Sequence, residues 1–265
     1  MNPPPSIQRN HHPIPLQDPA ADTLHFGGVH FGGLYFGGLY FGGLYFGGSF
    51  DPPHLGHASL PPQAAHQLEH QLKLPAGSCR LIYVPAARSP HKESAPTADH
   101  HRLSMLNIAL KDLDCPWTIW DQELKDAPLN PGQPSYWADT WAIANTLQPK
   151  ATNHFLIGAD QALSMHRWHR YTEFWKSAVV MMRGDTHHIN THSIDSLIQS
   201  LDQLGVWSKE DLNHWRSSCL SLEMVPWSST SIRTQLATID RQKNTRIEGL
   251  DPGVQSYIFD NDLYL

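Results

Sequence analysis

Short apolar runs alternate with longer segments of mixed polarity along most of this chain. The apolar runs have the length of strands and lie at residues 79–86 (CRLIYVPA), 117–124 (WTIWDQEL), 154–160 (HFLIGAD), 178–184 (AVVMMRG) and 220–226 (LSLEMVP). The segments between and after them predict helices at residues 97–112, 135–147, 161–176, 229–239 and 251–260. This alternation predicts an α/β fold with one Rossmann-like, doubly wound parallel sheet and helices on both faces. Ligands bind to such sheets at the carboxyl ends of the strands.

The first 43 residues do not follow this pattern. Residues 1–25 are rich in Pro, Gln, Asn and His and poor in aliphatic side chains, so we predict a disordered tail there. Residues 26–43 repeat a Phe-Gly-Gly phrase every five residues, a period that matches neither a strand nor a helix. We interpret them as duplicated copies outside the core, with one domain spanning residues 44–265 and its first strand starting at Leu44. The alternative class is an interaction protein that self-associates through the Gly-aromatic tract.

Composition and charge narrow the possible functions. The chain has 265 residues, of which 40% are hydrophobic, and this is enough for one buried core. Its formal net charge of -6 leaves no basic excess to neutralise many phosphates, which argues against a general nucleic-acid binder but not against a small anionic ligand. The three cysteines are widely spaced and form no Cys-x-x-Cys pair, and no apolar run resembles a signal peptide or a membrane span. We therefore expect a soluble cytoplasmic protein with no membrane partner.

The stretch LYFGGSFDPPHLGH at residues 44–57 is the first candidate for chemistry. It predicts a short apolar strand, a Gly-Gly exit that lets backbone approach a ligand, and a proline-fixed turn into a helix. His54 and His57 stand three residues apart at the start of that helix, so both rings can face one point near its positive end. This pattern predicts an anion site with two extra donors. Two incidental histidines, or a metal pair with no third ligand nearby, are the alternatives.

A second candidate lies near the other end of the chain, in VPWSSTSIRTQL at residues 225–236. Ser228, Ser229 and Thr230 stand at a predicted helix start, and Arg233 follows on the first turn. Hydroxyls, backbone N–H groups and a guanidinium can converge there on an anion. The alternative is a capped helix with a solvated arginine.

Together the two stretches resemble the signature pair of the nucleotidylyltransferase superfamily, and the sequence between and after them resembles the bacterial nicotinate-nucleotide adenylyltransferases. The matching segments are VPAARSPHK (84–92), RLSML (102–106), ELKDAPLNPGQPSYWADT (123–140), IGADQALSMHRWHRY (157–171), VVMMRG (179–184) and GLDPGVQSYIFDNDLY (249–264). They occur in the family's order and cover about residues 44–265, so the set is far more specific than any single motif.

The resemblance implies an enzyme of NAD biosynthesis that transfers AMP from ATP to nicotinate mononucleotide and releases pyrophosphate, without a covalent intermediate. It implies that His54 and His57 are catalytic, and that the ATP site comprises these two residues with Gly47, Gly48, Ser49, Phe50, Asp160, Ser229, Thr230 and Arg233. The implied acceptor site comprises Lys92, Tyr136, Trp137, Trp168 and His169, with Trp168 stacking on the pyridine ring. Mg²⁺ would bridge the phosphates of ATP with few protein ligands, and no other metal site is implied. The implied partners are these small molecules, with no nucleic acid.

Three of these assignments have ordinary structural alternatives. Asp160 would cap a helix as readily as it would accept hydrogen bonds from ribose, Trp168 would serve as a core side chain, and Lys92 would serve as a solvated surface lysine. The acceptor is also open, because a superfamily member that uses nicotinamide mononucleotide or pantetheine phosphate would share the ATP motifs.

The sequence departs from the family pattern at three places. Trp137 follows Ser135-Tyr136 where the family usually has Thr, and His169 follows Trp168 where an aromatic hydroxyl is expected. Backbone recognition of the acceptor's carboxylate would tolerate both changes, whereas side-chain recognition would put selectivity for the acid in doubt. The pair Pro61-Pro62 falls within the helix that starts near His57, so we expect a kink or a new helix start there.

Overall fold

The structure is a computed structural model, and it describes residues 24–26, 29–31, 34–36, 39–88, 96–182, 193–222, 225–240 and 245–265, with side chains described from residue 42 onward. Most of the expected disordered tail and the candidate residue Lys92 lie outside these ranges, so both expectations stay predictions.

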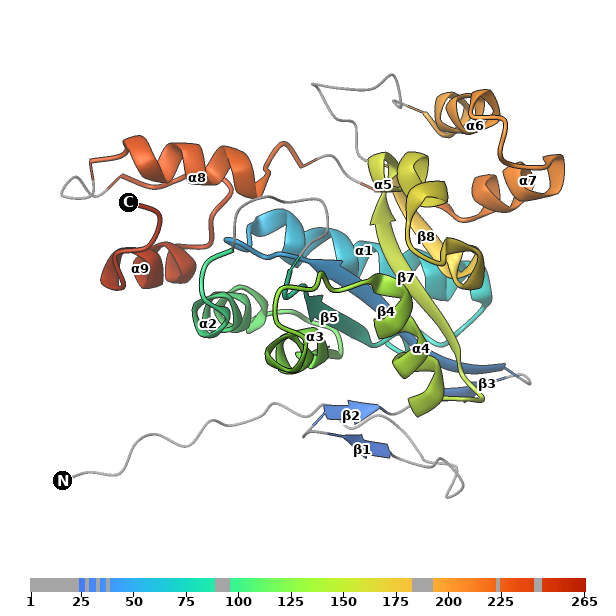
Figure 1. Cartoon of the computed structure of the whole chain (residues 1–265), viewed down its shortest axis with the longest axis horizontal. Coiled ribbons are helices and arrows are strands. Elements are labelled where there is room, and N and C mark those ends of the chain that lie inside the picture. Colours follow the sequence, from blue (N-terminus) through green and yellow to red (C-terminus); the bar gives the residue numbers. More distant parts are fainter. Residues whose placement is uncertain are drawn as a thin grey trace.

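A mostly parallel sheet forms the centre of the molecule (Figure 1). Its parallel strands are β4 (Leu39–Gly48), β5 (Leu81–Pro85), β6 (Trp117–Ile119), β7 (Thr152–Gly158), β8 (Ala178–Met182) and β9 (Cys219–Ser221). They lie in the order β6-β5-β4-β7-β8-β9, and each neighbouring pair is parallel. Read in chain order this is 3-2-1-4-5-6, the strand order of a dinucleotide-binding sheet, and the Rossmann-like fold expected from the sequence is confirmed.

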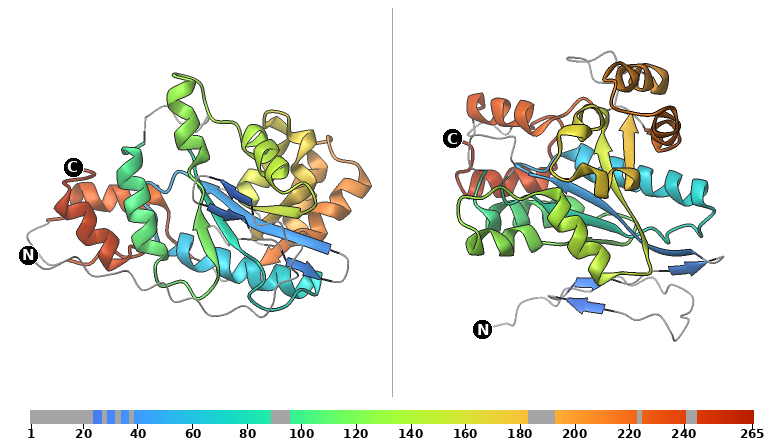
Figure 2. Two further views of the ribbon diagram at one scale, coloured as in Figure 1. Left: turned by 90° about the horizontal axis from the view of Figure 1, so that it is seen from below. Right: turned by 45° about the vertical axis from the view of Figure 1, so that its right-hand side comes forward.

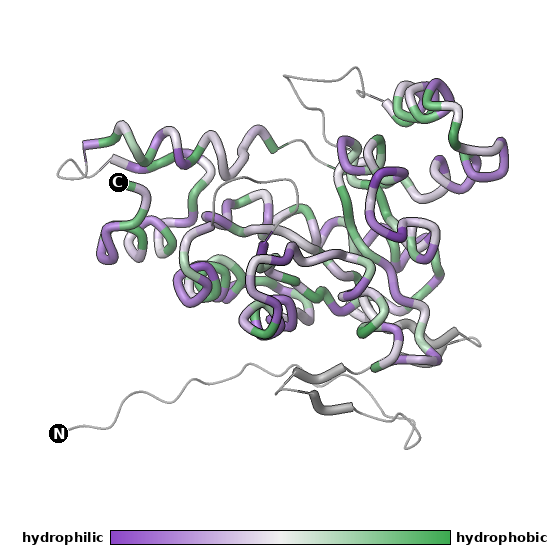
Figure 3. Tube along the Cα trace, viewed as in Figure 1, coloured by the Kyte–Doolittle hydropathy of each residue, from purple (hydrophilic) through white to green (hydrophobic). Residues whose placement is uncertain are grey.

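The strands are apolar at nearly every position because both faces of the sheet are covered. Successive side chains point to opposite faces, so Leu44 packs with the helices of one side and Tyr45 with those of the other. The same alternation separates Tyr83 from Val84 on β5. In Figure 3 the central strands are accordingly largely hydrophobic, whereas the helices alternate in polarity.

Helices cover both faces of the sheet and form a third cluster at one end. α1 (Leu55–Leu72) and α2 (Asp99–Leu110) pack on one face, and the other face is covered by α4 (Trp137–Leu147), α5 (Ala159–Ser164), α6 (Ile194–Gln203) and α7 (Lys209–Ser217). α8 (Ser229–Thr238) and α9 (Pro252–Asp260) pack with α2, at the opposite end of the molecule from α6 and α7 (Figure 2). None of the helices in the described part of the chain has the length and apolar character needed to cross a membrane.

Several predicted elements differ from the observed ones. The run at residues 117–124 is a strand only as far as Ile119, and its second half starts the short helix α3 (Gln122–Asp126). The helix predicted at residues 161–176 ends at Ser164 and gives way to 3-10 turns, because Trp168 is extended and Arg170 is left-handed. α6 and α7 were not predicted. Both helices are mostly polar and bury only a narrow apolar stripe, which includes Leu197, Leu201 and Trp215.

The prolines of α1 do not restart the helix, so that part of the expectation is wrong. α1 continues from Leu55 to Leu72 with Pro61 and Pro62 inside it. A proline removes the hydrogen bond to the carbonyl four residues earlier, which for Pro61 is the carbonyl of His57. The hydroxyl of Tyr83 on β5 donates to that carbonyl at 3.0 Å and replaces the missing bond. The sheet therefore supports the helix at the turn where the helix alone would fail.

The Phe-Gly-Gly repeat forms short strands. β1 (Leu24–Phe26) and β2 (Val29–Phe31) pair antiparallel as a separate ribbon, and β3 (Leu34–Phe36) pairs antiparallel with the start of β4. The expected start of the first strand at Leu44 is therefore wrong by five residues. The expected boundary between repeat and domain, at residues 43 and 44, falls inside β4.

The buried glycines of that copy explain why it belongs to the sheet. The register between β4 and β7 shifts between Phe41 and Leu44, which is a local bulge. A Cβ on Gly42 would lie 1.9 Å from the side-chain oxygen of Asn153, and one on Gly43 would lie 2.5 Å from Ile82. Only glycine allows β7 and β5 to approach β4 this closely, so Gly42 and Gly43 are packed against the core strands.

Truncation distinguishes the copies of the repeat at residues 34–43 from the earlier ones. A chain that begins with Met fused to Leu34 keeps the β3–β4 pair, and we expect its Tm to stay within about 2 °C of the full chain. A chain that begins with Met fused to Leu44 loses β3 and half of β4. A loss of about 2 kcal/mol lowers Tm by roughly 4–8 °C in a domain of this size, and we expect at least that. Thermal unfolding measures both, and equal Tm values for the two truncated chains would contradict this role of residues 34–43.

Candidate active site

The carboxyl ends of β4 and β7 mark the place where the sheet can hold a ligand. The chain leaves β4 toward β5 and leaves β7 toward β8, so the loops after these neighbouring strands diverge and leave a crevice. A cavity of about 600 Å³ opens there. Its walls are formed by Gly47, Gly48, Ser49, Val84, Ala86, Glu123, Ser135, Tyr136, Trp137, Phe155, Leu156, Ile157, Gln161, Arg167, Trp168 and His169.

The two histidines of the first motif cap the helix that follows β4. His54 is the N-cap of α1, and its Nδ1 accepts a hydrogen bond from the backbone N–H of Gly56 at 3.1 Å. Nδ1 of His57 accepts from the backbone N–H of His54 at 3.0 Å, and the two rings stack with centroids 3.7 Å apart. Because both Nδ1 atoms accept, each neutral ring carries its proton on Nε2. Nε2–H is therefore the N–H donor of each neutral ring.

Phe50 packs against the ring of His57. Its side chain is buried, and its ring forms a T-shaped pair with the His57 ring at a centroid distance of 5.0 Å. Phe46 contacts both rings from β4. Phe50 was expected to bind ATP, but its side chain belongs to the core, so only its backbone could contact a nucleotide.

The second motif contacts the turn that leads into the first one. Ser228 caps α8, and its hydroxyl accepts from the N–H of Ser231 at 3.1 Å. From the first turn of α8, the hydroxyl of Ser229 donates to the carbonyl of Pro52 at 2.9 Å. Arg233 donates to the carbonyl of Asp51 at 2.6 Å and to the hydroxyl of Thr230 at 3.3 Å. The fold thus brings together the two stretches that the sequence placed about 170 residues apart.

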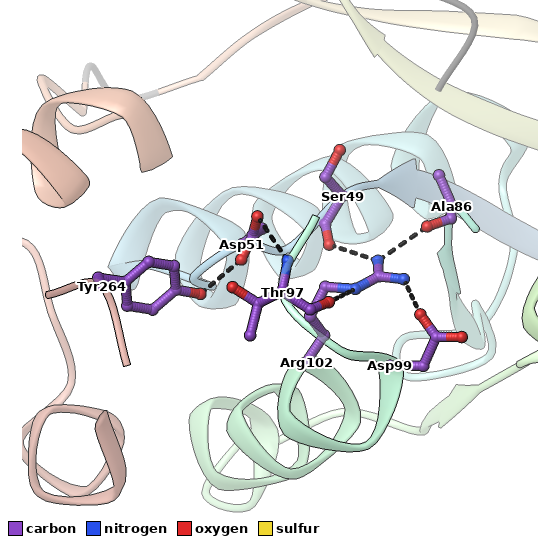
Figure 4. Close-up of polar contacts among 7 residues, drawn as sticks. All are labelled: Ser49, Asp51, Ala86, Thr97, Asp99, Arg102 and Tyr264. Atoms are coloured by element: carbon purple, nitrogen blue, oxygen red, sulfur yellow. Dashed lines mark hydrogen bonds and ion pairs between the residues drawn. The ribbon is translucent and has the colours of Figure 1, made fainter. Parts of the chain in front are cut away.

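The carboxylate of Asp51 fixes the same turn from its other side (Figure 4). It accepts from the hydroxyl of Tyr264 at 2.5 Å and from the backbone N–H of Thr97 at 3.3 Å. Burial, followed by the hydrogen bond to Asp51, raises the pKa of Tyr264 well above its ordinary value, so the phenol remains a donor. The last residues of the chain therefore hold the loop that follows its first long strand.

A buried arginine closes the network (Figure 4). Arg102 on α2 has no exposed surface, and its guanidinium donates to the carbonyls of Ser49, Ala86 and Thr97 at 2.8–3.0 Å. It also pairs with Asp99 at 2.6 Å. Ser49 and Ala86 directly follow β4 and β5, so one side chain ties together the ends of two neighbouring strands.

The expected acceptor residues of the described chain lie together on the cavity wall. Tyr136 and His169 face each other with ring centroids 4.5 Å apart, and Trp168 lies beside them with its Nε1 donating to Ser164 at 3.3 Å. The ring of Trp137 lies so close to β4 that a Cβ on Gly47 would be 3.0 Å from it. The glycine exit of the strand therefore makes room for the aromatic wall.

Asp160 differs from its expected position. β7 ends at Gly158, and Asp160 lies exposed on the first turn of α5, outside the cavity wall. The side chain of Gln161, not that of Asp160, accepts from the N–H of Gly158 at the start of the helix. The alternative that Asp160 caps the helix is therefore wrong, whereas an exposed carboxylate beside the crevice can still accept from a ribose.

Sequence reasoning missed four residues that shape the site, namely Arg102, Glu123, Arg167 and Tyr264. All four lie within segments that matched the family, so the sequence marked their positions but did not indicate what each residue does. Glu123 is the least expected, because a carboxylate lies buried in a wall that is otherwise largely aromatic and apolar. Burial raises the pKa of Glu123, while hydrogen bonds from Thr140, Ala87 and Ser135 and the charge of Arg102 act in the opposite sense.

This arrangement suits charge stabilisation better than covalent catalysis. Imidazoles, hydroxyls, a guanidinium and helix starts gather around the end of β4, and an aromatic wall adjoins them. Among the residues described, no group of three or more His, Cys, Asp or Glu side chains could hold a metal ion. The donors fit a polyphosphate, and the wall fits a flat ring.

Comparisons with known proteins agree with this geometry. The family model described as cytidylyltransferase-like matches residues 45–235. The probable nicotinate-nucleotide adenylyltransferase of Idiomarina loihiensis is 32% identical over 222 residues, which cover 82% of this chain and 96% of the relative. The nicotinic acid mononucleotide adenylyltransferase of Plasmodium falciparum, solved in complex with NaAD, has a TM-score of 0.59 and 16% identity, covering 83% of this chain and 96% of its own. The same protein in complex with APC gives a TM-score of 0.55 at the same identity and coverage.

At 16% identity the likeness to the solved structures is one of fold. The family match is stronger, because the model covers most of the chain and the bacterial relative aligns over nearly its whole length. This chain therefore belongs to the cytidylyltransferase-like family, as a relative of its nicotinate-nucleotide adenylyltransferases.

Proposed function

We propose that this enzyme transfers AMP from ATP to the phosphate of nicotinate mononucleotide, giving nicotinate adenine dinucleotide and pyrophosphate. The observation that carries the proposal is the junction at the end of β4, where Gly47, Gly48 and Ser49 line an aromatic cavity of about 600 Å³ and the chain then enters the turn at residues 51 and 52, which leads into α1 and is bonded by α8. Such a site would hold a flat ring and a polyphosphate side by side. The three cysteines are free, which agrees with action in the reducing cytoplasm.

The chemistry requires positioning and charge stabilisation. The acceptor's phosphate attacks the α-phosphorus of ATP in line, the bond to the β-phosphate oxygen breaks, and pyrophosphate leaves. His54 and His57 would donate from Nε2 to the phosphates as negative charge shifts toward the leaving group. Thr230, on the exposed side of α8, and Arg233 would hold the pyrophosphate end. The backbone of Gly47, Gly48 and Ser49 lets the nucleotide approach the strand.

The aromatic wall would hold the acceptor. Trp168 would stack on the pyridine ring, beside the Tyr136 and His169 pair, and Arg167 on the same wall would attract the anionic mononucleotide. Trp137 is the first residue of α4 and His169 follows Trp168, so the backbone N–H groups of these segments can serve the carboxylate whatever side chains they carry. Lys92 remains a proposed additional cation.

Mg²⁺ would reach the site on the phosphates of ATP. Mg²⁺ usually keeps several waters and takes one or two protein ligands together with substrate phosphates. The donors around β4 and α8 are mainly cationic or hydroxyl groups, and Asp51 already accepts from Tyr264 and Thr97. These residues fit a metal-bound polyphosphate better than a bare cation, and the metal would neutralise phosphate charge.

One prediction of the proposed function concerns the acceptor. With ATP and Mg²⁺, the purified protein should release pyrophosphate only when a phosphorylated acceptor is present, and nicotinate mononucleotide should give the highest kcat/KM. Parallel assays with nicotinamide mononucleotide and pantetheine phosphate supply the comparison. Equal or better turnover with nicotinamide mononucleotide would overturn the selectivity for the acid. No turnover with any acceptor would overturn the proposed activity and favour the interaction-protein alternative.

Another prediction of the proposed function concerns His57. His57→Ala should lower kcat by roughly 10²- to 10³-fold, the effect of losing one preorganised donor to transition-state charge, and should change the Kd for ATP much less. Because Nδ1 of His57 also caps α1, His57→Asn is the sharper variant, since its amide oxygen can accept from the N–H of His54.

Single-turnover kinetics with a stability measurement separate these effects. His66→Ala provides the control, because His66 lies on an exposed part of the same helix. Near-normal turnover in folded His57→Asn would remove the ring from the mechanism.

A further inference from the structure

Glu123 is the buried ionisable group of the cavity that the proposed chemistry does not use. It lies on α3, directly after β6, and its residue is 8% exposed. The hydroxyl of Thr140 on α4 donates to its Oε1 at 2.8 Å, and Thr140 is itself buried. Polar contacts from the backbone of Ala87 and the side chain of Ser135 also favour the charged carboxylate.

These partners belong to three different segments that border the cavity. Ala87 follows β5, Ser135 precedes α4, and Thr140 lies on α4 one turn beyond Trp137. The backbone N–H of Ser135 donates to the carbonyl of Arg88 at 3.0 Å, which joins the first two segments a second time. One carboxylate therefore holds the stretch that carries Tyr136 and Trp137 against the end of β5.

The opposite wall of the cavity has supports that do not involve Glu123. Trp168 is held by Ser164, and Arg170 in the same turn pairs with Glu173 at 2.7 Å, although it also pairs with Asp139 of α4 at 2.9 Å. The phosphate-side histidines are held by their own backbone bonds and by Phe50. A change confined to Glu123 should therefore act first on residues 135–137, and reach the opposite wall through the Tyr136–His169 and Asp139–Arg170 contacts.

We propose that Glu123 is a positioning residue that holds residues 135–137 in place and so sets the affinity for the mononucleotide acceptor. The identity of the acceptor rests on the proposed function, whereas the positioning role rests on the contacts alone. Burial raises the pKa of Glu123, and the hydrogen bonds oppose this shift, which agrees with a carboxyl group that depends on all its partners. Losing one partner of a buried hydrogen bond leaves the other unsatisfied, so a small change should have a measurable effect.

The test compares Glu123→Gln with a matched buried carboxylate. Gln keeps the volume but turns an NH₂ group toward donors that need an acceptor. Glu69 provides the control, because it is also buried and accepts from the backbone N–H groups of Gly77 and Cys79 at 3.1 and 2.6 Å, beyond the cavity wall. Thr140→Val removes one hydrogen-bond partner of Glu123 while nearly preserving the shape of the side chain at position 140.

Calorimetric titrations with nicotinate mononucleotide and, separately, with Mg²⁺-ATP give the readout. Glu123→Gln should raise Kd for the mononucleotide about tenfold and change Kd for ATP less than twofold. Thr140→Val should act in the same direction, and the double variant should lose less than the product of the two single effects because they share one interaction. Glu69→Gln should lower Tm without changing either Kd.

The outcomes distinguish failure of the positioning role from failure of the proposed function. If Glu123→Gln leaves mononucleotide binding unchanged, weakens both ligands equally or behaves as Glu69→Gln does, the positioning role is overturned. Absence of mononucleotide binding in the unaltered protein would overturn it as well. If the unaltered protein binds the mononucleotide but releases no pyrophosphate, the proposed function fails while the comparison of Kd values still tests Glu123.

Discussion

The hydrogen bonds of Arg102 to the ends of two neighbouring strands are the interaction on which the site depends. Carbonyl groups just beyond a parallel strand have lost their ladder partners, and those of Ser49 and Ala86 receive theirs from one buried guanidinium. A buried arginine is tolerated only when its donors are satisfied, and Thr97 and Asp99 accept two more of its five N–H groups. This requirement fixes where the chain leaves β4, and therefore where His54 and His57 start the next helix.

The same turn is held from the far end of the chain. Arg233 and Ser229 bond to the backbone of residues 51 and 52, and Tyr264 bonds to the carboxylate of Asp51. These contacts span about 180 to 210 residues, so the phosphate-side donors reach their places only when the α8–α9 cluster has packed on α2. Local caps orient each histidine, and long-range contacts set the position of the helix start that carries them. Folding of the whole domain is thus a condition for forming the site.

The sequence predicted what local pattern and motif spacing control. Alternating apolar runs predicted the parallel sheet, and glycines, histidines and hydroxyls at element starts predicted the donor groups. It could not predict roles that arise from tertiary contacts. Tyr83 is an ordinary strand residue until its hydroxyl replaces the bond that Pro61 removes from α1. Glu123 is one charge near the end of a predicted strand until α4 and the end of β5 close around it. The need for glycine at position 42 likewise appears only once the side chain of Asn153 is packed against it.

The repeat shows why such contacts must decide the register of the first strand. A slip by one copy would place Leu39-Tyr40-Phe41-Gly42-Gly43 where Leu44 to Gly48 now lie, with the same residue type at every position. The alternation of side chains between the two faces normally protects a strand against slippage. Here it does not distinguish the two registers. What distinguishes the registers is the sequence after Gly48, because the slip would put Phe46 where Asp51 bonds to Tyr264 and Thr97. The contacts that build the phosphate site are thus also the contacts that select one copy of the repeat as the end of the strand.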